Sequence, residues 1–172
     1  KALEKSIKIM NDTWELFFNK DTQLFQKNII KDNDLFASPL DLNDSNIPNG
    51  NSVYLLISNK LYSITNDKIW SERNEVLKKS FHQVLNSYYS QMFSFIKTLD
   101  ICDNSLSFTF SGTSQSIKEM QLYLQKEYLG VATFVYQLNN DTKPSVIICK
   151  NQTCSNKLTN ISEAVEYLSK SD

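Results

Sequence analysis

The sequence predicts an α+β protein, in which helical hairpins are followed by a small β-α-β-β-α unit. Through most of residues 1–103, apolar side chains recur at spacings of three and four, as in helices that bury one face. From Asn104 onward apolar and polar residues alternate, and short β-branched runs follow, which is typical of strands. We therefore expect a helical-hairpin region at 1–103, with a long irregular loop at 19–51, and a small α/β subdomain at 104–172.

The helical region should begin with a helix that runs to about Phe18 and continue in antiparallel hairpins with short connections. A second helix follows Gly50 and ends at the turn 65–67, Ser71 suits the N-cap of a third, and a fourth ends near Asp100. The expected buried faces of these helices are, in order, Leu3, Ile7, Met10, Trp14 and Phe17; Val53, Leu56, Ile57, Leu61 and Ile64; Val76, Leu77, Phe81, Val84 and Leu85; and Tyr88, Tyr89, Met92, Phe93, Ile96 and Leu99.

The loop at 19–51 loses helical periodicity and contains Pro39 and Pro48. A loop of this length in a compact domain is usually functional or packed by its own side chains. We expect a short hairpin around Phe25 and Ile30. The apolar side chains available for packing are Leu24, Phe25, Ile29, Ile30, Leu35, Phe36 and Leu40.

The α/β subdomain should start with a strand that turns inward Leu106, Phe108 and Phe110. Residues 111–114 lead into a helix, a second strand covers 131–136, and a third covers 146–149. Because the first two strands flank a helix, we expect them to be parallel and joined by a right-handed crossover. Asn160, with Glu163 three positions later, resembles a capping box at the start of a last helix.

Composition and charge argue against several classes of function. The 18 Lys and Arg nearly balance the 19 Asp and Glu, and no basic run creates a local surface for nucleic acid. A hydrophobic content of 41% argues against intrinsic disorder. The longest apolar stretches, such as 53–57, are far shorter than the roughly 18 residues that span a bilayer. We therefore expect no nucleic acid and no membrane as partners.

The chain enters a helical pattern directly at Lys1, without a charged and apolar signal region. We therefore expect it to be a piece of a longer protein. Cys102, Cys149 and Cys154 are an odd number of cysteines in a chain with no such signal, which favours a reducing compartment, and hence the cytoplasm, over a disulfide scaffold.

Cysteine and histidine do not form a recognisable catalytic or metal set. Four residues separate Cys149 from Cys154, and neither the spacing nor the position matches a redox motif at a helix N-terminus, so we interpret both as structural. A structural zinc site needs four ligands, and only Cys102 and His82 remain to complete one. We therefore expect no metal and no cofactor, and no catalytic role for the single His82.

Residues 41–53 are the most informative stretch. Pro48 and Gly50 predict a turn, and Asn51 or Ser52 can cap the following helix. Carboxylates and amides on a loop at a helix N-terminus also suit a hydroxyl-rich ligand such as a sugar. The segment 111–114 has a single glycine, so an ordinary N-cap at Thr113 or Ser114 is favoured there over a phosphate site.

Residues 36–53, F-A-S-P-L-D-L-N-D-S-N-I-P-N-G-N-S-V, resemble a segment of the YyaL-like family. These are the thioredoxin-domain proteins that include the spermatogenesis-associated animal members, and their pattern is close to F-A-R-P-K-D-x-x-D-G-A-x-P-S-G-N-S-V. Cys149, Asn151 and Cys154 also match the family's C-x-N-F-x-C element, with Gln152 in place of the aromatic residue. This chain departs from the pattern at Ser45, Asn46 and Asn49. The order of helices and strands agrees, so the resemblance covers nearly the whole chain.

The resemblance implies a place in a larger architecture. The family joins an N-terminal thioredoxin-like domain to a helical toroid that is similar to six-hairpin glycosidases and sugar epimerases. This chain would be a C-terminal fragment that holds the last helical hairpins of the toroid and a C-terminal α/β appendage. It implies a role in carbohydrate metabolism, a carbohydrate ligand, and a candidate ligand cleft near Asp44, Asn51 and Ser52. The partner would be the remainder of the parent protein or a second copy.

Two other functions remain open. The lack of a complete catalytic set favours a non-catalytic protein-interaction module built on the α/β subdomain. The thioredoxin association of the family favours a thiol redox protein that uses Cys149 and Cys154. If the chain is part of a toroid, missing hairpins would leave an apolar surface exposed. The residues expected there are Trp14, Phe17, Phe81, Met92 and Phe93.

Overall fold

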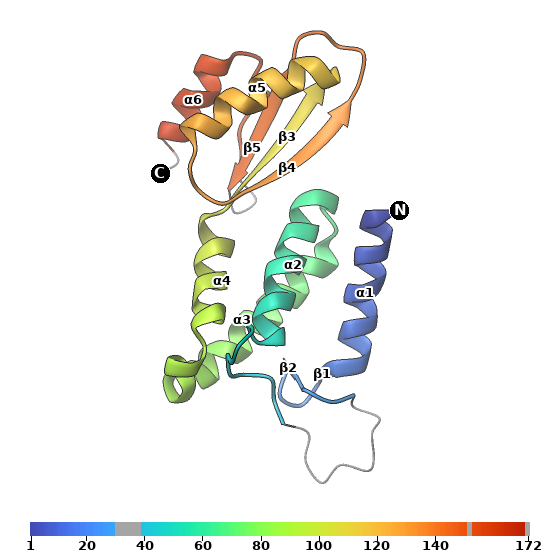
Figure 1. The fold of residues 1–172 in the computed structure, drawn as a ribbon, viewed down its shortest axis with the longest axis vertical. Coiled ribbons are helices and arrows are strands. Elements are labelled where there is room, and N and C mark those ends of the chain that lie inside the picture. The colour runs from blue at the N-terminus through green and yellow to red at the C-terminus, as the bar shows by residue number, and fades with distance from the viewer. Residues whose placement is uncertain (30–38, 151–152, 171–172) are drawn as a thin grey trace. The chain divides into compact units, whose positions relative to one another are not determined.

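The computed structural model describes residues 1–29, 39–150 and 153–170. It confirms the α+β class. The chain separates into two compact units, Lys1–Cys102 and Asp103–Asp172 (Figure 1). The first unit is built almost entirely of helices, and the second combines helices with a small mixed sheet.

The first unit contains long helices and one minimal hairpin. The helices are α1 (Ala2–Phe17), α2 (Gly50–Thr65), α3 (Lys68–Tyr88) and α4 (Phe93–Asn104), with a 3-10 turn, η1 (Tyr89–Gln91), before α4. The strands β1 (Phe18–Asn19) and β2 (Leu24–Phe25) pair antiparallel. Asn66, in the left-handed conformation at φ 55°, ends α2 and turns the chain into α3, as the 65–67 turn predicts.

Several local predictions for this unit are wrong. Asn49, rather than Asn51 or Ser52, caps α2. Asp67, not Ser71, caps α3, because its carboxylate accepts a hydrogen bond from the Ile69 N–H at 3.1 Å. α3 continues to Tyr88, so the fourth predicted helix starts later, at Phe93. The hairpin predicted around Phe25 and Ile30 can be compared only at Phe25, which pairs with Phe18, because Ile30 lies outside the described residues. Ile30, Leu35 and Phe36, which were expected to pack the loop, lie outside the described residues.

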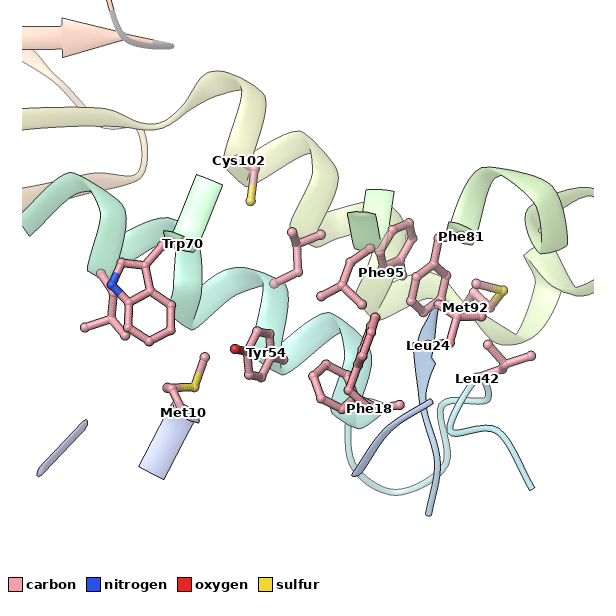
Figure 2. Close-up of a cluster of buried hydrophobic side chains, with 14 residues drawn as sticks. Met10, Phe18, Leu24, Leu42, Tyr54, Trp70, Phe81, Met92, Phe95 and Cys102 are labelled. Atoms are coloured by element: carbon pink, nitrogen blue, oxygen red, sulfur yellow. The ribbon is translucent and has the colours of Figure 1, made fainter. Parts of the chain in front are cut away.

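The core of the first unit joins all four helices and the hairpin (Figure 2). Phe81 of α3 and Phe95 of α4 stack with ring centroids 3.6 Å apart. The predicted apolar surface is wrong for Phe81 and Met92, which are completely buried in this core. Trp14 and Phe17 also pack against it, and of the five predicted residues Phe93 is the one that is largely exposed, at 67%. Packing within the unit therefore accounts for most of the aromatic residues that the sequence assigns to an outer face.

The second unit is a four-stranded sheet with two helices. The strands are β3 (Leu106–Gly112), β4 (Ala132–Leu138), β5 (Ser145–Lys150) and β6 (Thr153–Cys154), in the order β4-β3-β5-β6. The prediction that the first two strands are parallel is confirmed, whereas β5 is antiparallel to both β3 and β6. The helices are α5 (Ser114–Glu127) and α6 (Ile161–Ser169).

Both helices of the second unit cover the same face of the sheet. The inward residues of β3 and β5 join the inner faces of α5 and α6 in one buried cluster. Thr113 and Asn160 cap the two helices through their side chains, as predicted. Gly112, at φ 148°, makes the turn from β3 into α5, and a Cβ there would lie 3.3 Å from the Pro144 Cα. The opposite face of the sheet carries the alternate residues of each strand, which in β3 are the polar Ser107, Thr109 and Ser111.

Candidate functional site

One carboxylate joins the starts of two helices in the first unit. Asp44 accepts hydrogen bonds from the Asn49 backbone N–H at 3.0 Å and the Asn49 side-chain amide at 2.9 Å. It also accepts from the Ser94 N–H at 2.6 Å and from the Ser94 hydroxyl. Because Asn49 caps α2 and Ser94 lies in the first turn of α4, Asp44 receives donors from two helix N-termini.

The surroundings of Asp44 favour its charged form. Burial raises the pKa of the Asp44 carboxyl, but the hydrogen bonds from Ser94 and Asn49 outweigh burial and hold this pKa below its usual range. Ser52 extends the same network, since its hydroxyl donates to the Asn49 carbonyl at 2.8 Å and shares a hydrogen bond of 2.7 Å with the Ser94 hydroxyl. The network fixes the loop 44–49 against both helices.

Asn51 ties the same loop to the hairpin. Its side-chain oxygen accepts from the Phe25 N–H at 2.8 Å, and its amide donates to the Asp41 carbonyl at 2.7 Å and the Phe25 carbonyl at 3.3 Å. Asp41 in turn accepts a hydrogen bond from the Gly50 N–H. A Cβ at Gly50 would lie 2.6 Å from that carboxylate, so a larger residue there would displace the Asp41 side chain.

This loop forms one wall of a pocket of about 620 Å³ between α1 and the start of α2. That volume lies within the usual range of small-molecule sites, about 300–1,000 Å³. The lining is predominantly apolar, and Asp41 and Lys27 bring opposite charges to it. The lining residues are Ile9, Met10, Thr13, Lys27, Asp41, Asn43, Ser45, Ile47, Pro48, Asn49, Gly50, Val53, Tyr54 and Ile57.

A cluster around Arg73 holds Tyr54 in the pocket lining. The guanidinium donates to the Tyr54 hydroxyl at 3.0 Å and to the Asn11 side chain at 2.8 Å. It also lies 4.8 Å from the ring centroid of Trp14 and 5.2 Å from that of Trp70. Burial raises the pKa of Tyr54 to about 12, although Arg73 lowers it in part, so the phenol stays neutral at physiological pH.

The three site residues predicted from the sequence do not lie at the surface of the pocket. Asp44 and Ser52 meet at Asn49 and Ser94, whereas Asn51 points to β2. Asn51 and Ser52 are at most 1% exposed, and none of these three residues lines the pocket. The charged residue of this segment that does line the pocket is Asp41. Sequence reasoning missed Ser94, because its bond to Asp44 joins residues 50 positions apart.

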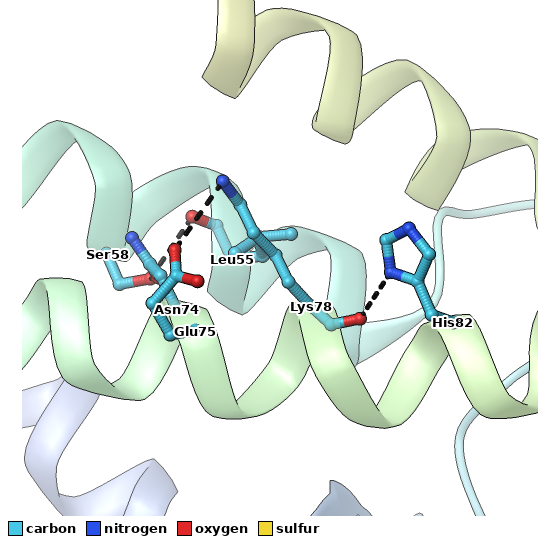
Figure 3. A network of polar contacts seen from close by, with 6 residues as sticks. All are labelled: Leu55, Ser58, Asn74, Glu75, Lys78 and His82. Atoms are coloured by element: carbon cyan, nitrogen blue, oxygen red, sulfur yellow. Dashed lines mark hydrogen bonds and ion pairs between the residues drawn. The ribbon is translucent and has the colours of Figure 1, made fainter. Parts of the chain in front are cut away.

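His82, on α3, does not line the pocket. Its Nδ1 is 2.7 Å from the Lys78 carbonyl oxygen, and the side chain is exposed (Figure 3). On the same helix, Asn74 accepts a hydrogen bond from the buried Ser58 hydroxyl and so links α3 to α2 (Figure 3). Within residues 1–29, 39–150 and 153–170, no cluster of three His, Cys, Asp or Glu side chains is arranged to hold a metal ion. In the same ranges, no helix combines the length and the apolarity needed to cross a membrane.

The second unit contains a disulfide, which the cysteine number and the lack of a signal region did not favour. Cys149 of β5 and Cys154 of β6 lie opposite each other in the antiparallel register, with Cα atoms 4.0 Å apart, and form a disulfide. Neither lies at a helix N-terminus. Cys102, in the first unit, is buried. Asn151 and Gln152, which belong to the motif between the paired cysteines, lie outside the described residues.

Removing this disulfide by the double substitution Cys149→Ser and Cys154→Ser is expected to lower the stability of the second unit by about 2 kcal/mol. The cross-link restricts the unfolded chain, and its short loop keeps the effect modest. Hydrogen exchange of the β3 and β5 amides measures the loss. A thiol reductant should produce the same loss in the wild type and none in the double variant. Unchanged exchange in both comparisons would contradict a structural role.

The sequence was compared with protein-family models and with curated proteins. No family model matches the chain, and no curated protein matches it.

Proposed function

We propose that this chain is the C-terminal part of a YyaL-like protein, in which its helical unit completes a carbohydrate-enzyme-like helical domain. In this proposal the pocket between α1 and α2 holds part of a hydroxyl-rich ligand. The second unit is the C-terminal α/β appendage. The parent protein, or a second copy, is the partner.

The proposal rests on the hydrogen bonds made by residues 41–52, which belong to the segment that resembles the family. Asn49 caps α2, Gly50 admits the Asp41 carboxylate, and Asn51 holds the hairpin. These polar groups of the motif therefore bond to other groups of the protein and hold the loop in one conformation. A rigid loop at the mouth of a pocket is what a binding site needs, because a preorganised wall loses little entropy when ligand binds.

The pocket offers chemistry that suits a sugar. Asp41 presents a carboxylate that accepts hydrogen bonds from hydroxyl groups, and Asn43 and Ser45 add an amide and a hydroxyl at the rim. Val53 and Ile57 supply exposed apolar surface for the C–H groups of a pyranose ring. This makes Asp41 the principal polar contact in the proposed site. Asn51 holds the Asp41 backbone, and Asp44 and Ser52 hold Asn49 in the same loop.

Titration with glucose, mannose and N-acetylglucosamine, followed by NMR, tests this site. We expect chemical-shift changes at the methyl groups of Met10, Val53 and Ile57. The substitution Asp41→Asn keeps the shape of the side chain and removes its charge, and it should weaken binding by about tenfold, as for the loss of one charged hydrogen bond. Glu72→Gln, which removes a charge from an exposed position on α3, should leave binding unchanged.

Two outcomes would contradict the carbohydrate proposal. One is the absence of shifts at the pocket with all three sugars. The other is equal binding by the wild type and the Asp41→Asn variant. The family assignment has a separate test in the coding sequence upstream of Lys1, which should encode further helical hairpins and a thioredoxin-like domain. A complete open reading frame without them would leave the pocket proposal standing and remove the family assignment.

A second candidate function is a non-catalytic interaction module. The predominantly apolar lining of the pocket favours it, because an apolar side chain of a partner could occupy the same space. In that case the three sugars would produce no shifts, whereas a peptide with a central leucine or phenylalanine would perturb Val53 and Ile57.

A further inference from the structure

The strand β4 forms an open edge of the sheet in the second unit. Within the described parts of the chain, β4 pairs with β3 alone, along its full length from Ala132 to Leu138. It contains no charged residue, no proline and no glycine. Tyr136 is 48% exposed and Leu138 is 68% exposed. Long apolar edges without charge or proline lack the features by which proteins usually prevent strand pairing.

The hydrogen bonds to β3 determine which backbone groups of β4 remain available. The Leu106 N–H donates to the Val131 carbonyl at 3.1 Å, and the Asn139 N–H donates to the Gly112 carbonyl at 3.0 Å. In a parallel pair, alternate residues direct both backbone groups to the same side. The odd-numbered residues of β4 therefore bond to β3. Four residues direct their N–H and C=O groups outward, namely Ala132, Phe134, Tyr136 and Leu138.

We propose that β4 pairs antiparallel with β4 of a second copy, about a two-fold axis at Val135, to form one continuous sheet across two chains. With this centre, Ala132 meets Leu138 and Phe134 meets Tyr136 of the other copy. Both are pairs of outward-directed residues, so the full overlap of the strands forms about eight backbone hydrogen bonds. The inference does not depend on the proposed carbohydrate site, which belongs to the first unit.

The side chains of β4 suit the same register. Phe134 and Tyr136 lie on the face covered by α5 and α6, where Phe134 packs near Phe108 and Tyr136 stacks on Phe110. Their mutual pairing across the axis would place aromatic rings side by side, which stabilises antiparallel strands. On the opposite face, Thr133 meets Gln137 of the other copy, and no like charges face each other. A strand that is uncharged and symmetric about its centre fits a copy of itself, whereas it offers no charge to select an unrelated peptide.

Charge substitutions at Val135 test the pairing, because a residue on the axis faces its own copy. In sedimentation velocity of the full chain over a dilution series, we expect the wild type to dimerise. Val135→Lys and Val135→Glu should each weaken dimerisation by about tenfold or more, since each places like charges opposite one another. An equimolar mixture of the two variants should restore the dimer. Leu129→Lys, at a residue that is 93% exposed and outside β4, should leave dimerisation unchanged.

Hydrogen exchange gives a second, independent readout. In the wild type at dimer concentrations, the amides of Phe134 and Tyr136 should gain protection relative to the Val135→Lys variant, while the Thr133 and Val135 amides, already bonded to β3, should change little. Recovery of the dimer on mixing also shows that both variants fold. A monomeric wild type over its soluble range, dimers of both single variants, or a mixture that stays monomeric would each overturn the proposal.

Discussion

Replacing Asn51 by alanine is expected to lower the free energy of unfolding of the helical unit by about 4 kcal/mol. Asn51 is completely buried and makes three hydrogen bonds to the backbone of Phe25 and Asp41. Without its side chain, the Phe25 N–H and the Asp41 carbonyl lose their partners in a site closed to water, whereas the Phe25 carbonyl keeps the Asp41 N–H as a donor. Each such group costs about 1–3 kcal/mol when it is left unsatisfied.

Chemical denaturation, with the emission of Trp14 and Trp70 as the signal, measures this loss. Asn59→Ala is the matched control, because it makes the same substitution on the same helix at a partly exposed position. There the change should stay within about 0.5 kcal/mol. A loss at Asn51 no larger than that at Asn59 would show that water satisfies the exposed backbone groups, and that the loop is less tightly joined to β2 than its contacts indicate.

Local patterns sufficed for most helices and strands, because their signals lie within a few residues of one another. Asn66 located the end of α2, and the alternation at Leu106 located β3. The apolar period located α2 but predicted the wrong buried face, because Val53, Ile57 and Ile64 are exposed. The start of α3 was misplaced because Asp67 and Ser71 are both good capping residues. Tertiary packing favours the earlier one, since a helix that begins at Lys68 buries Trp70, which is only 1% exposed, in the core.

The sequence alone identified the segment 41–53 as a candidate site. It did not predict which residues the side chains of this segment would contact. Asp44 binds Ser94, which is 50 residues away, and Asn51 binds Phe25, which is 26 residues away. Such pairings depend on how the helices pack, which local spacing does not contain. The same limit explains the disulfide, because Cys154 meets Cys149 only through the register of β6 on β5. The cysteine number and the lack of a signal region, on which the sequence analysis relied, contain no information on this register.

Asp44→Asn is expected to lower the free energy of unfolding by about 3 kcal/mol at neutral pH, after allowance for partial screening by solvent. The carboxylate accepts from two backbone N–H groups, one amide and one hydroxyl, all at the starts of α2 and α4. An asparagine has one oxygen to accept these bonds, and its own amide would face other donors. The starts of both helices should therefore loosen together.

The dependence on pH identifies the charge as the cause. The folded-state pKa of Asp44 lies below its value in the unfolded chain, so its ionised form stabilises the fold above the unfolded pKa of about 3.9, and this contribution is lost as the pH falls through the folded pKa. The difference in unfolding free energy between wild type and Asp44→Asn should therefore be largest at neutral pH and shrink below about pH 4. Asp21→Asn, at an exposed position in the hairpin turn, serves as the control for charge alone. Equal differences at pH 7 and pH 3 would assign the loss to shape, and the idea that one carboxylate anchors two helix N-termini by its charge would fail.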